Sequence, residues 1–214
     1  MWPVRLDCFS QDLFLGRLHS GNLASVKAAN RLGHGEVTLR RLSRFDYSIL
    51  NELLTLDRDW LEPWEATTPG IRRALDVKWL IRSLLSQSKD GSGLAFVIEH
   101  QRKVVGQLNV ANILYGSVSS GTIGYWITKD SAGQGITPTA VALAIDYLFT
   151  ELGLHRVEID IRPDNHASLR VAEKLGLRHE GTKLRYIHID GAWRDHHVFA
   201  ITQEELSGSM LRRL

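Results

Sequence analysis

A six-residue loop with two glycines, Ala132-Gly133-Gln134-Gly135-Ile136-Thr137, carries the strongest chemical signal in the sequence. It follows a predicted strand and leads directly into a predicted helix. The first N–H groups of a helix lack partners within the helix, and the helix dipole gives that end partial positive charge. Gly133 and Gly135 let the backbone approach an anion closely because no side chain intervenes. The loop therefore predicts a phosphate-binding site, although a Gly-x-Gly turn alone is more often ordinary turn chemistry.

Two other nucleotide-binding loops are excluded at this position. A Walker loop would need Gly-Lys-Ser or Gly-Lys-Thr, whereas Gly135 is followed by Ile136 and Thr137. A dinucleotide fingerprint would need a third glycine and a βαβ setting, whereas the strands before this loop have the pattern of a hairpin. An anion site of another kind and a plain turn are the interpretations that remain.

A second pair of candidate residues, Asn165 and Ser168, lies three positions apart at the start of a predicted helix. This spacing places both side chains on the same face of that helix. Spacing alone favours an N-cap followed by an ordinary helical serine. The alternative is that the pair supplies an amide and a hydroxyl to a bound molecule.

An acidic segment at residues 52–65 surrounds two tryptophans, Trp60 and Trp64. Its only basic residue is Arg58, and its acidic residues are Glu52, Asp57, Asp59, Glu62 and Glu65. A solvated run of charges is the usual explanation. Beside an acceptor site, the same charge would attract a cationic amine. The tryptophans are equally compatible with a core and with the wall of a ligand site.

Three histidines near the C-terminus, His188, His196 and His197, do not predict a metal site. Adjacent residues on a strand point to opposite faces, so His196 and His197 cannot easily share one ion. We therefore expect no metal cofactor.

These candidates must be positioned by an α/β arrangement around a mixed sheet. Residues 1–35 show no sustained period and end in Gly33-His34-Gly35, so we interpret them as an N-terminal extension of unknown role. From residue 36 the periodicity predicts the order β-α-α-β-β-β-α-β-α-β-β. Helices are predicted at residues 45–56 and 74–87, from the glycine loop to Gly153, and from a cap at Asp164 or Asn165 to Leu175; strands are predicted near 37–39, 94–99, 104–113, 121–128, 157–161, 178–189 and 193–201.

The composition of the 214 residues is that of a globular protein with a sizeable core. A net charge of +2 is too small to predict nucleic-acid or membrane binding. The single cysteine, Cys8, excludes an intramolecular disulfide and a multi-cysteine zinc site. No segment has the ~18 consecutive apolar residues of a membrane span, and the N-terminus does not have the pattern of a signal peptide. We therefore expect a cytoplasmic protein.

Several motifs together resemble the GNAT acetyltransferase superfamily and cover residues 36–204. The segment Gly124-Tyr125-Trp126-Ile127, the glycine loop and the helix after it resemble its motif A. Residues 163–168 and 172–181 resemble motif B of the Rim-type branch, which acetylates the N-terminal α-amine of ribosomal proteins. Residues 61–65 and 189–196 resemble the RimJ-type subgroup of that branch.

The resemblance implies a GNAT fold, with a mixed and mostly antiparallel sheet of about seven strands flanked by about four helices. The domain would cover residues 36–205, followed by a C-terminal tail at 206–214. Acetyl-CoA would give its acetyl group to an amine by direct attack in a ternary complex. The cofactor-binding residues that the resemblance implies are Trp126, Ile127, Thr128, Ala132, Gly133, Gln134, Gly135, Ile136, Thr137, Asn165 and Ser168.

The same resemblance implies catalytic roles. A backbone N–H near Ile127 would stabilise negative charge on the acetyl carbonyl oxygen. Asn165 would bind the pantetheine arm, and Ser168 would donate a hydrogen bond to the CoA sulfur. Some Rim-type enzymes carry a glutamate base on the penultimate strand, but the matching residue here is Ile187. We predict Glu65 as a substitute base; an exposed loop carboxylate with no such role, or a water relay, are the alternatives.

Two residues of the glycine loop depart from the family pattern. Ala132 stands where the family usually has Gln or Arg, and Thr137 stands where it has Gly or Ala. Backbone amides do most of the holding in such a loop, so we expect cofactor binding to survive both changes.

The leading hypothesis is acetylation of a protein N-terminus, with a ribosomal protein as the target that the resemblance implies. Trp64, Glu65 and Tyr125 would contact this acceptor. The alternatives are an acetyltransferase for a small amine (a polyamine, an amino acid or an antibiotic) and a non-catalytic acyl-CoA-binding or ribosome-associated module. The expected partners are a protein N-terminus and the ribosome, without membrane or DNA binding, and the protein would be a monomer or a homodimer.

Overall fold

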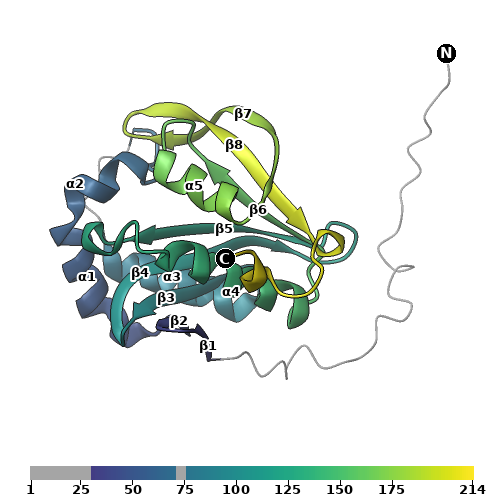
Figure 1. Ribbon diagram of the computed structural model, residues 1–214. Coiled ribbons are helices and arrows are strands. Elements are labelled where there is room, and N and C mark those ends of the chain that lie inside the picture. The colour runs from purple at the N-terminus through teal and green to yellow at the C-terminus, as the bar shows by residue number, and fades with distance from the viewer. Residues whose placement is uncertain (1–29, 71–75) are drawn as a thin grey trace, which may run out of the picture.

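The structure, a computed structural model, describes residues 30–70 and 76–214 and is built around one eight-stranded sheet (Figure 1). The strand order is β1-β2-β3-β4-β5-β6-β8-β7, and every neighbouring pair is antiparallel except β5 and β6. The predicted mixed, mostly antiparallel sheet is therefore confirmed, with eight strands in place of about seven. The strands are β1 (Arg31–His34), β2 (Val37–Arg41), β3 (Leu94–His100), β4 (Lys103–Leu114), β5 (Ser120–Ile127), β6 (Arg156–Ile161), β7 (Arg178–Ile189) and β8 (Ala192–Thr202).

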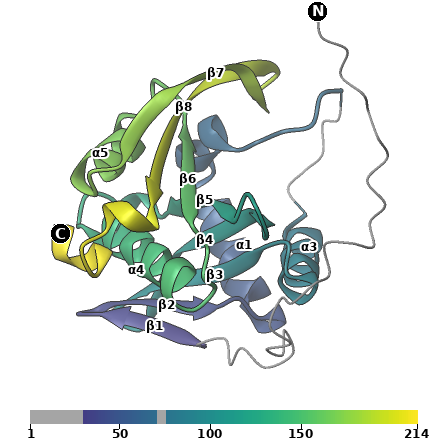
Figure 2. The same cartoon turned by 90° about the vertical axis from the view of Figure 1, so that its right-hand side faces the viewer.

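Helices cover both faces of the sheet (Figure 2). One face carries α1 (Tyr47–Leu56) and α3 (Val77–Asp90), and the other carries α4 (Ile136–Thr150) and α5 (His166–Lys174). Because both faces of β3 are covered, this strand is a continuous apolar run rather than an alternating one. Phe96 and Ile98 pack in the same core cluster as α4, whereas Ala95 and Val97 pack with residues of α1 and α3.

Helix α4 is buried on nearly all sides, which the predicted amphipathic pattern did not anticipate. The reason is the C-terminal segment, which packs against this helix. Met210 is fully buried, and its backbone N–H donates to the Asp146 carboxylate of α4 at 2.6 Å. Ser209 donates to the same carboxylate at 2.6 Å. Residues 206–214 are thus part of the folded domain rather than a free tail.

Two further elements correct the sequence prediction. Residues Arg31–His34, assigned to the N-terminal extension, form β1 and pair with β2; residues 1–29 of the extension lie outside the described residues. The segment predicted as a loop after residue 57 contains a short helix, α2 (Arg58–Leu61), followed by a 3-10 turn at Glu62–Trp64. Strand β1 and helix α2 are each four residues long and the 3-10 turn has three, which is too short for a detectable period.

The two halves of the sheet separate between β5 and β6. Their parallel pairing joins Ser120–Thr122 only to Arg156–Glu158, while β5 continues for five more residues to Ile127. Beyond Thr122 the two strands diverge (Figure 1). This divergence leaves one backbone edge of β5 free of strand partners and creates the space in which the candidate site lies.

No described helix is both long enough and apolar enough to cross a membrane.

Candidate active site

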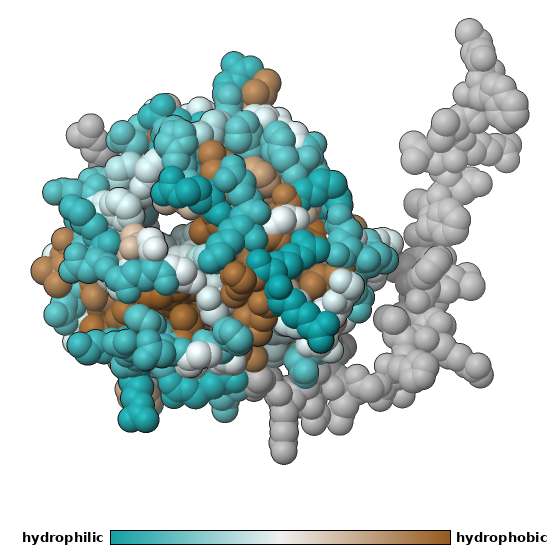
Figure 3. Space-filling view, viewed as in Figure 1, coloured by the Kyte–Doolittle hydropathy of each residue, from teal (hydrophilic) through white to brown (hydrophobic). Residues whose placement is uncertain are grey.

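A cavity of about 870 Å³ lies where β5 and β6 diverge. Its lining comes from α2 and the following 3-10 turn, from β4 and β5, from the glycine loop and the first turn of α4, and from α5 along its length, with Leu54 of α1 and Leu80 of α3. Figure 3 shows this face of the molecule hollowed between α2 and α5. Twelve of the predicted site residues line this one cavity: Trp64, Glu65, Tyr125, Trp126, Ile127, Ala132, Gly133, Gly135, Ile136, Thr137, Asn165 and Ser168.

The glycine loop forms one end of the cavity. Gly133 and Gly135 have φ angles of +77° and +78°, and Gly135 is the N-cap of α4. Both glycines therefore serve a left-handed turn that aims the first amides of α4 at the cavity. The two remaining predicted residues lie outside the lining and support the loop: Thr128 donates to Ser131 at 2.9 Å, and Gln134 donates to the Asp130 carbonyl at 2.7 Å. This end has the geometry of an anion site.

The end of β5 presents one backbone N–H to the cavity. The Thr128 N–H donates to the Val105 carbonyl of β4 at 2.8 Å. Backbone groups of successive strand residues point to alternate edges, so the groups of Ile127 point away from β4, toward the divergence. The indole N–H of Trp60 donates to the Ile127 carbonyl at 3.1 Å, on that side. The Ile127 N–H therefore points into the divergence without a strand partner there, and its role as an oxyanion donor stays a prediction.

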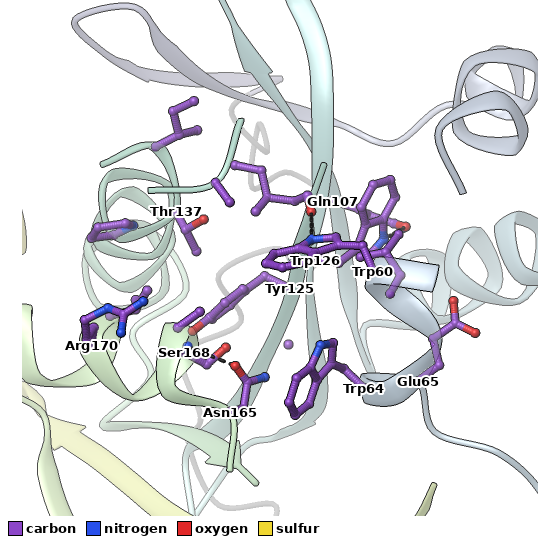
Figure 4. Close-up of a pocket in the computed structure, with 18 of the residues that line it drawn as sticks. Trp60, Trp64, Glu65, Gln107, Tyr125, Trp126, Thr137, Asn165, Ser168 and Arg170 are labelled. Atoms are coloured by element: carbon purple, nitrogen blue, oxygen red, sulfur yellow. Dashed lines mark hydrogen bonds between the residues drawn. The ribbon is translucent and has the colours of Figure 1, made fainter. Parts of the chain in front are cut away.

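Asn165, Ser168 and Tyr125 meet in the middle of the cavity (Figure 4). The Asn165 carbonyl caps α5 by accepting from the Ser168 N–H at 3.1 Å, so the capping interpretation holds and leaves the amide NH₂ available. The Tyr125 hydroxyl end points toward Ser168. Burial raises the pKa of Tyr125 to about 12, and its interaction with Ser168 offsets part of that rise. Two neutral hydroxyl groups thus lie side by side at physiological pH.

Glu65 lines the cavity, but its carboxylate is occupied. Arg58 donates to both oxygens, at 2.8 and 2.7 Å, and the pKa of Arg58 is raised mainly by this hydrogen bond. Figure 4 shows the Glu65 carboxylate directed away from Tyr125 and Ser168. Both oxygens of this carboxylate are thus engaged by one guanidinium group, and neither is directed at the middle of the cavity. Its role as a base stays a prediction, and the geometry favours a structural role in the loop.

The segment after α2 is tied to the other half of the sheet. Arg162, just after β6, donates to the Pro63 carbonyl at 2.6 Å, and its guanidinium lies 5.0 Å from the centre of the Trp64 ring. Farther along, Ala66 forms a β-bridge with Ile189, and the Thr67 N–H donates to the His188 carbonyl at 2.8 Å. The segment therefore links the two halves of the sheet at the end of the cavity that Trp64, Glu65 and Ala66 line.

Several lining residues were missed by the sequence analysis. Gln107 and Asn109 are amides that alternate with apolar residues in the middle of β4, and that pattern was the only local signal for them. Arg170 and Lys174 are spaced four apart on α5, which places both on one face of the helix. Gly124 carried no signal beyond its place in the motif.

Among the described residues, no group of three His, Cys, Asp or Glu side chains is arranged to hold a metal ion.

Comparison with known proteins identifies the class of site. The family model for the acetyltransferase (GNAT) domain matches residues 36–178. The [ribosomal protein uS5]-alanine N-acetyltransferase of Escherichia coli (strain K12) is 28% identical over 176 residues, which are 80% of this chain and 90% of that protein. The protein named Probable N-acetyltransferase YjcK of Bacillus subtilis (strain 168) is 40% identical over 99 residues, and this match spans 46% of the chain and only 55% of YjcK.

A solved structure agrees with these matches. The Mycobacterium smegmatis RimJ in complex with CoA-disulfide superposes with a TM-score of 0.77 at 38% sequence identity, covering 83% of this chain and 87% of that one.

Proposed function

The chain belongs to the GNAT acetyltransferase family, and on that premise we propose that it transfers the acetyl group of acetyl-CoA to the N-terminal α-amine of a protein. It is an N-acetyltransferase that uses acetyl-CoA, as its family match and its relatives establish. The acceptor is the proposed part. The observation that supports the proposal is one continuous cavity, which is lined at one end by the glycine loop and the start of α4, elsewhere by the Trp64 segment, and also by Ile127.

The residues of the cofactor half fit CoA. The amides at the start of α4 suit a pyrophosphate, because glycine turns bring them to the surface without a covering side chain. The Asn165 amide NH₂ is available for a carbonyl of the pantetheine arm. The buried Tyr125 hydroxyl has no hydrogen-bond partner of normal geometry among the described residues. Buried polar groups are normally hydrogen-bonded, so this hydroxyl is suited to bond to a ligand.

When bound, acetyl-CoA supplies an acetyl group activated as a thioester. The Ile127 N–H is placed to stabilise the negative charge that develops on the acetyl oxygen as the new C–N bond forms. The Ser168 hydroxyl, which lies beside the Tyr125 hydroxyl, donates a hydrogen bond to the sulfur as the C–S bond breaks. The amine loses its proton to water, since the described carboxylates that line the cavity are held in ion pairs with Arg58 and Arg162.

Two comparisons support a protein acceptor. The Escherichia coli relative is named for the alanine of ribosomal protein uS5, and the Mycobacterium smegmatis neighbour is named RimJ. We therefore propose a ribosomal protein as the physiological target.

The test is mass spectrometry of intact ribosomal proteins from cells with and without the gene, combined with a purified assay. We expect one N-terminus to gain one acetyl group only when the gene is present. In the purified assay, a peptide with that N-terminal sequence should be acetylated faster than spermidine. Faster turnover of spermidine, with no change at any ribosomal N-terminus, would refute the proposed acceptor and leave the acetyltransferase assignment intact.

A further inference from the structure

The part of β4 that lines the cavity carries two amide side chains, which pair in register with residues of β5. Gln107 lies directly opposite Trp126, and Asn109 lies directly opposite Gly124. Directly opposed residues in an antiparallel pair point to the same face, so all four belong to one patch of the cavity lining. Gln107 is 1% exposed, so its amide is held by the protein rather than by solvent. No role in the reaction described above accounts for these amides.

The indole of Trp126 determines which group donates and which accepts in the chain of hydrogen bonds through this patch. An indole N–H can only donate, and the Trp126 Nε1–H donates to Oε1 of Gln107 at 3.2 Å (Figure 4). Nε2 of Gln107 must therefore face the other way, and it donates to Oδ1 of Asn109 at 3.1 Å. Because that bond occupies the Asn109 oxygen, the NH₂ group of Asn109 is the part left for the cavity. No described residue accepts a hydrogen bond from it.

The neighbouring glycine keeps this donor accessible. A Cβ added to Gly124 would meet no heavy atom within 4 Å, so the space beside Asn109 is open. Gly124 lies three residues before Ile127 on the same strand, about 10 Å at the usual rise per residue. An acetyl oxygen and a carbonyl oxygen that are joined through the attacking nitrogen and its α-carbon lie at most about 5 Å apart. One hydrogen bond of about 2.9 Å at each end, from the Ile127 N–H and from the Asn109 NH₂ group, brings the total close to that span.

We propose that the Asn109 NH₂ group donates a hydrogen bond to the carbonyl oxygen of the residue whose α-amine is acetylated. The site then selects an α-amino acyl group, the chemistry of a protein N-terminus, over alkylamines and polyamines, which offer no oxygen there. The donor is unsuited to bind a second ammonium group, because two donors facing each other leave both unsatisfied. This inference rests on the proposed acetyltransferase reaction and narrows its acceptor class.

The test compares two acceptors, alaninamide and isopropylamine, with the purified full chain and acetyl-CoA. The two amines share the carbon that bears the amine and one methyl group, and the carboxamide group of alaninamide is replaced by a second methyl group in isopropylamine. The variant is Asn109→Leu, which keeps the volume and removes the donor. We expect kcat/KM for alaninamide to fall about tenfold, the size of one lost hydrogen bond, while kcat/KM for isopropylamine is unchanged. Each acceptor is compared with itself across variants, so the different basicities of the two amines cancel.

Two further variants keep the test decisive if Asn109→Leu folds poorly. Asn109→Asp preserves the shape but turns an acceptor oxygen toward the cavity, so it should lower alaninamide turnover at least as strongly. The control is Asn51→Leu, the same Asn-to-Leu change at a position on α1 outside the cavity lining. It should leave the ratio of kcat/KM for alaninamide to kcat/KM for isopropylamine unchanged.

The outcomes separate the inference from the proposed function. An equal loss for both acceptors, or no loss for alaninamide, overturns the role of Asn109 even if protein N-termini are acetylated. An Asn109-dependent preference for alaninamide, with no acetylation of any protein N-terminus, supports the inference and overturns the proposed protein acceptor.

Discussion

Trp60 of α2 donates its indole N–H to the carbonyl oxygen of Ile127 on β5, across 3.1 Å and 67 positions of sequence. Because both backbone groups of Ile127 point to the same edge of the strand, this bond also orients the N–H that faces the cavity. The acidic, tryptophan-containing segment thus bonds to the end of β5 in addition to lining the cavity.

Replacing Trp60 by Phe should therefore slow acetyl transfer more than it weakens cofactor binding. The change removes one hydrogen bond, so we expect roughly a tenfold fall in kcat. Acetyl-CoA affinity, measured by isothermal titration calorimetry, should stay near the wild-type value. The matched control is Trp79→Phe, because Trp79 is 61% exposed on α3. Equal effects of the two substitutions on kcat would contradict the orienting role of Trp60.

Gly106→Ala should disturb the same peptide from the other side. A Cβ at Gly106 would lie 2.3 Å from the Trp126 carbonyl oxygen and 3.0 Å from the Ile127 Cα, so the backbone of β5 would have to move. We expect a loss of about 1–3 kcal/mol in unfolding free energy, typical of overpacking, and a fall in kcat of roughly 10-fold or more. Gly33→Ala is the control, because its Cβ would meet nothing closer than 3.6 Å. Wild-type kcat in Gly106→Ala would show that the position of this peptide is unimportant.

Ser168→Ala should slow turnover without abolishing CoA binding. The variant removes the hydroxyl beside Tyr125, whereas the cap of α5 survives because it uses the Ser168 backbone N–H. We expect roughly a tenfold or larger fall in kcat, with helix stability retained. Steady-state kinetics and CoA titration on the same preparation give both quantities. Unchanged turnover would exclude Ser168 as the donor to the sulfur.

The burial of Tyr125 should appear as a loss of stability at high pH. Its pKa is raised by burial to about 12, above the ordinary value of about 10. Between these values the unfolded chain releases the proton while the folded chain keeps it, so the stability is present below pH 10 and is lost as the pH rises toward 12. Denaturant unfolding at pH 8, 10 and 11 should show a steeper decline for wild type than for Tyr125→Phe. Parallel declines would contradict this assignment.

Cofactor affinity should depend on two cations of α5. The glycine loop has no basic side chain between residues 130 and 138, while Arg170 and Lys174 line the same cavity. We expect the double substitution Arg170→Ala with Lys174→Ala to weaken CoA binding about tenfold at low salt, and less at high salt. Arg82→Ala with Lys89→Ala removes equal charge from α3 and serves as the control. A salt-independent loss would argue against contact with the phosphates.

The sequence by itself determined the features that depend on neighbouring residues. Gly133 and Gly135 are needed for left-handed backbone, and the loop, the start of α4 and the Asn165 cap follow from short-range dihedral and hydrogen-bond preferences. The motif resemblance added the family, which the comparisons confirm, and most of the site residues that it implied line one cavity.

The tertiary structure alone decided which distant residues meet. Thr67 bonds to His188, which is 121 positions away in the sequence. Asn109 can reach the cavity only because the strand register places it opposite Gly124, which has no side chain. Glu65 was predicted as a base from its position beside Trp64, but packing brings Arg58 to its carboxylate. Such contacts depend on strand register, on the divergence of β5 from β6 and on side-chain packing, and no short-range preference encodes any of the three.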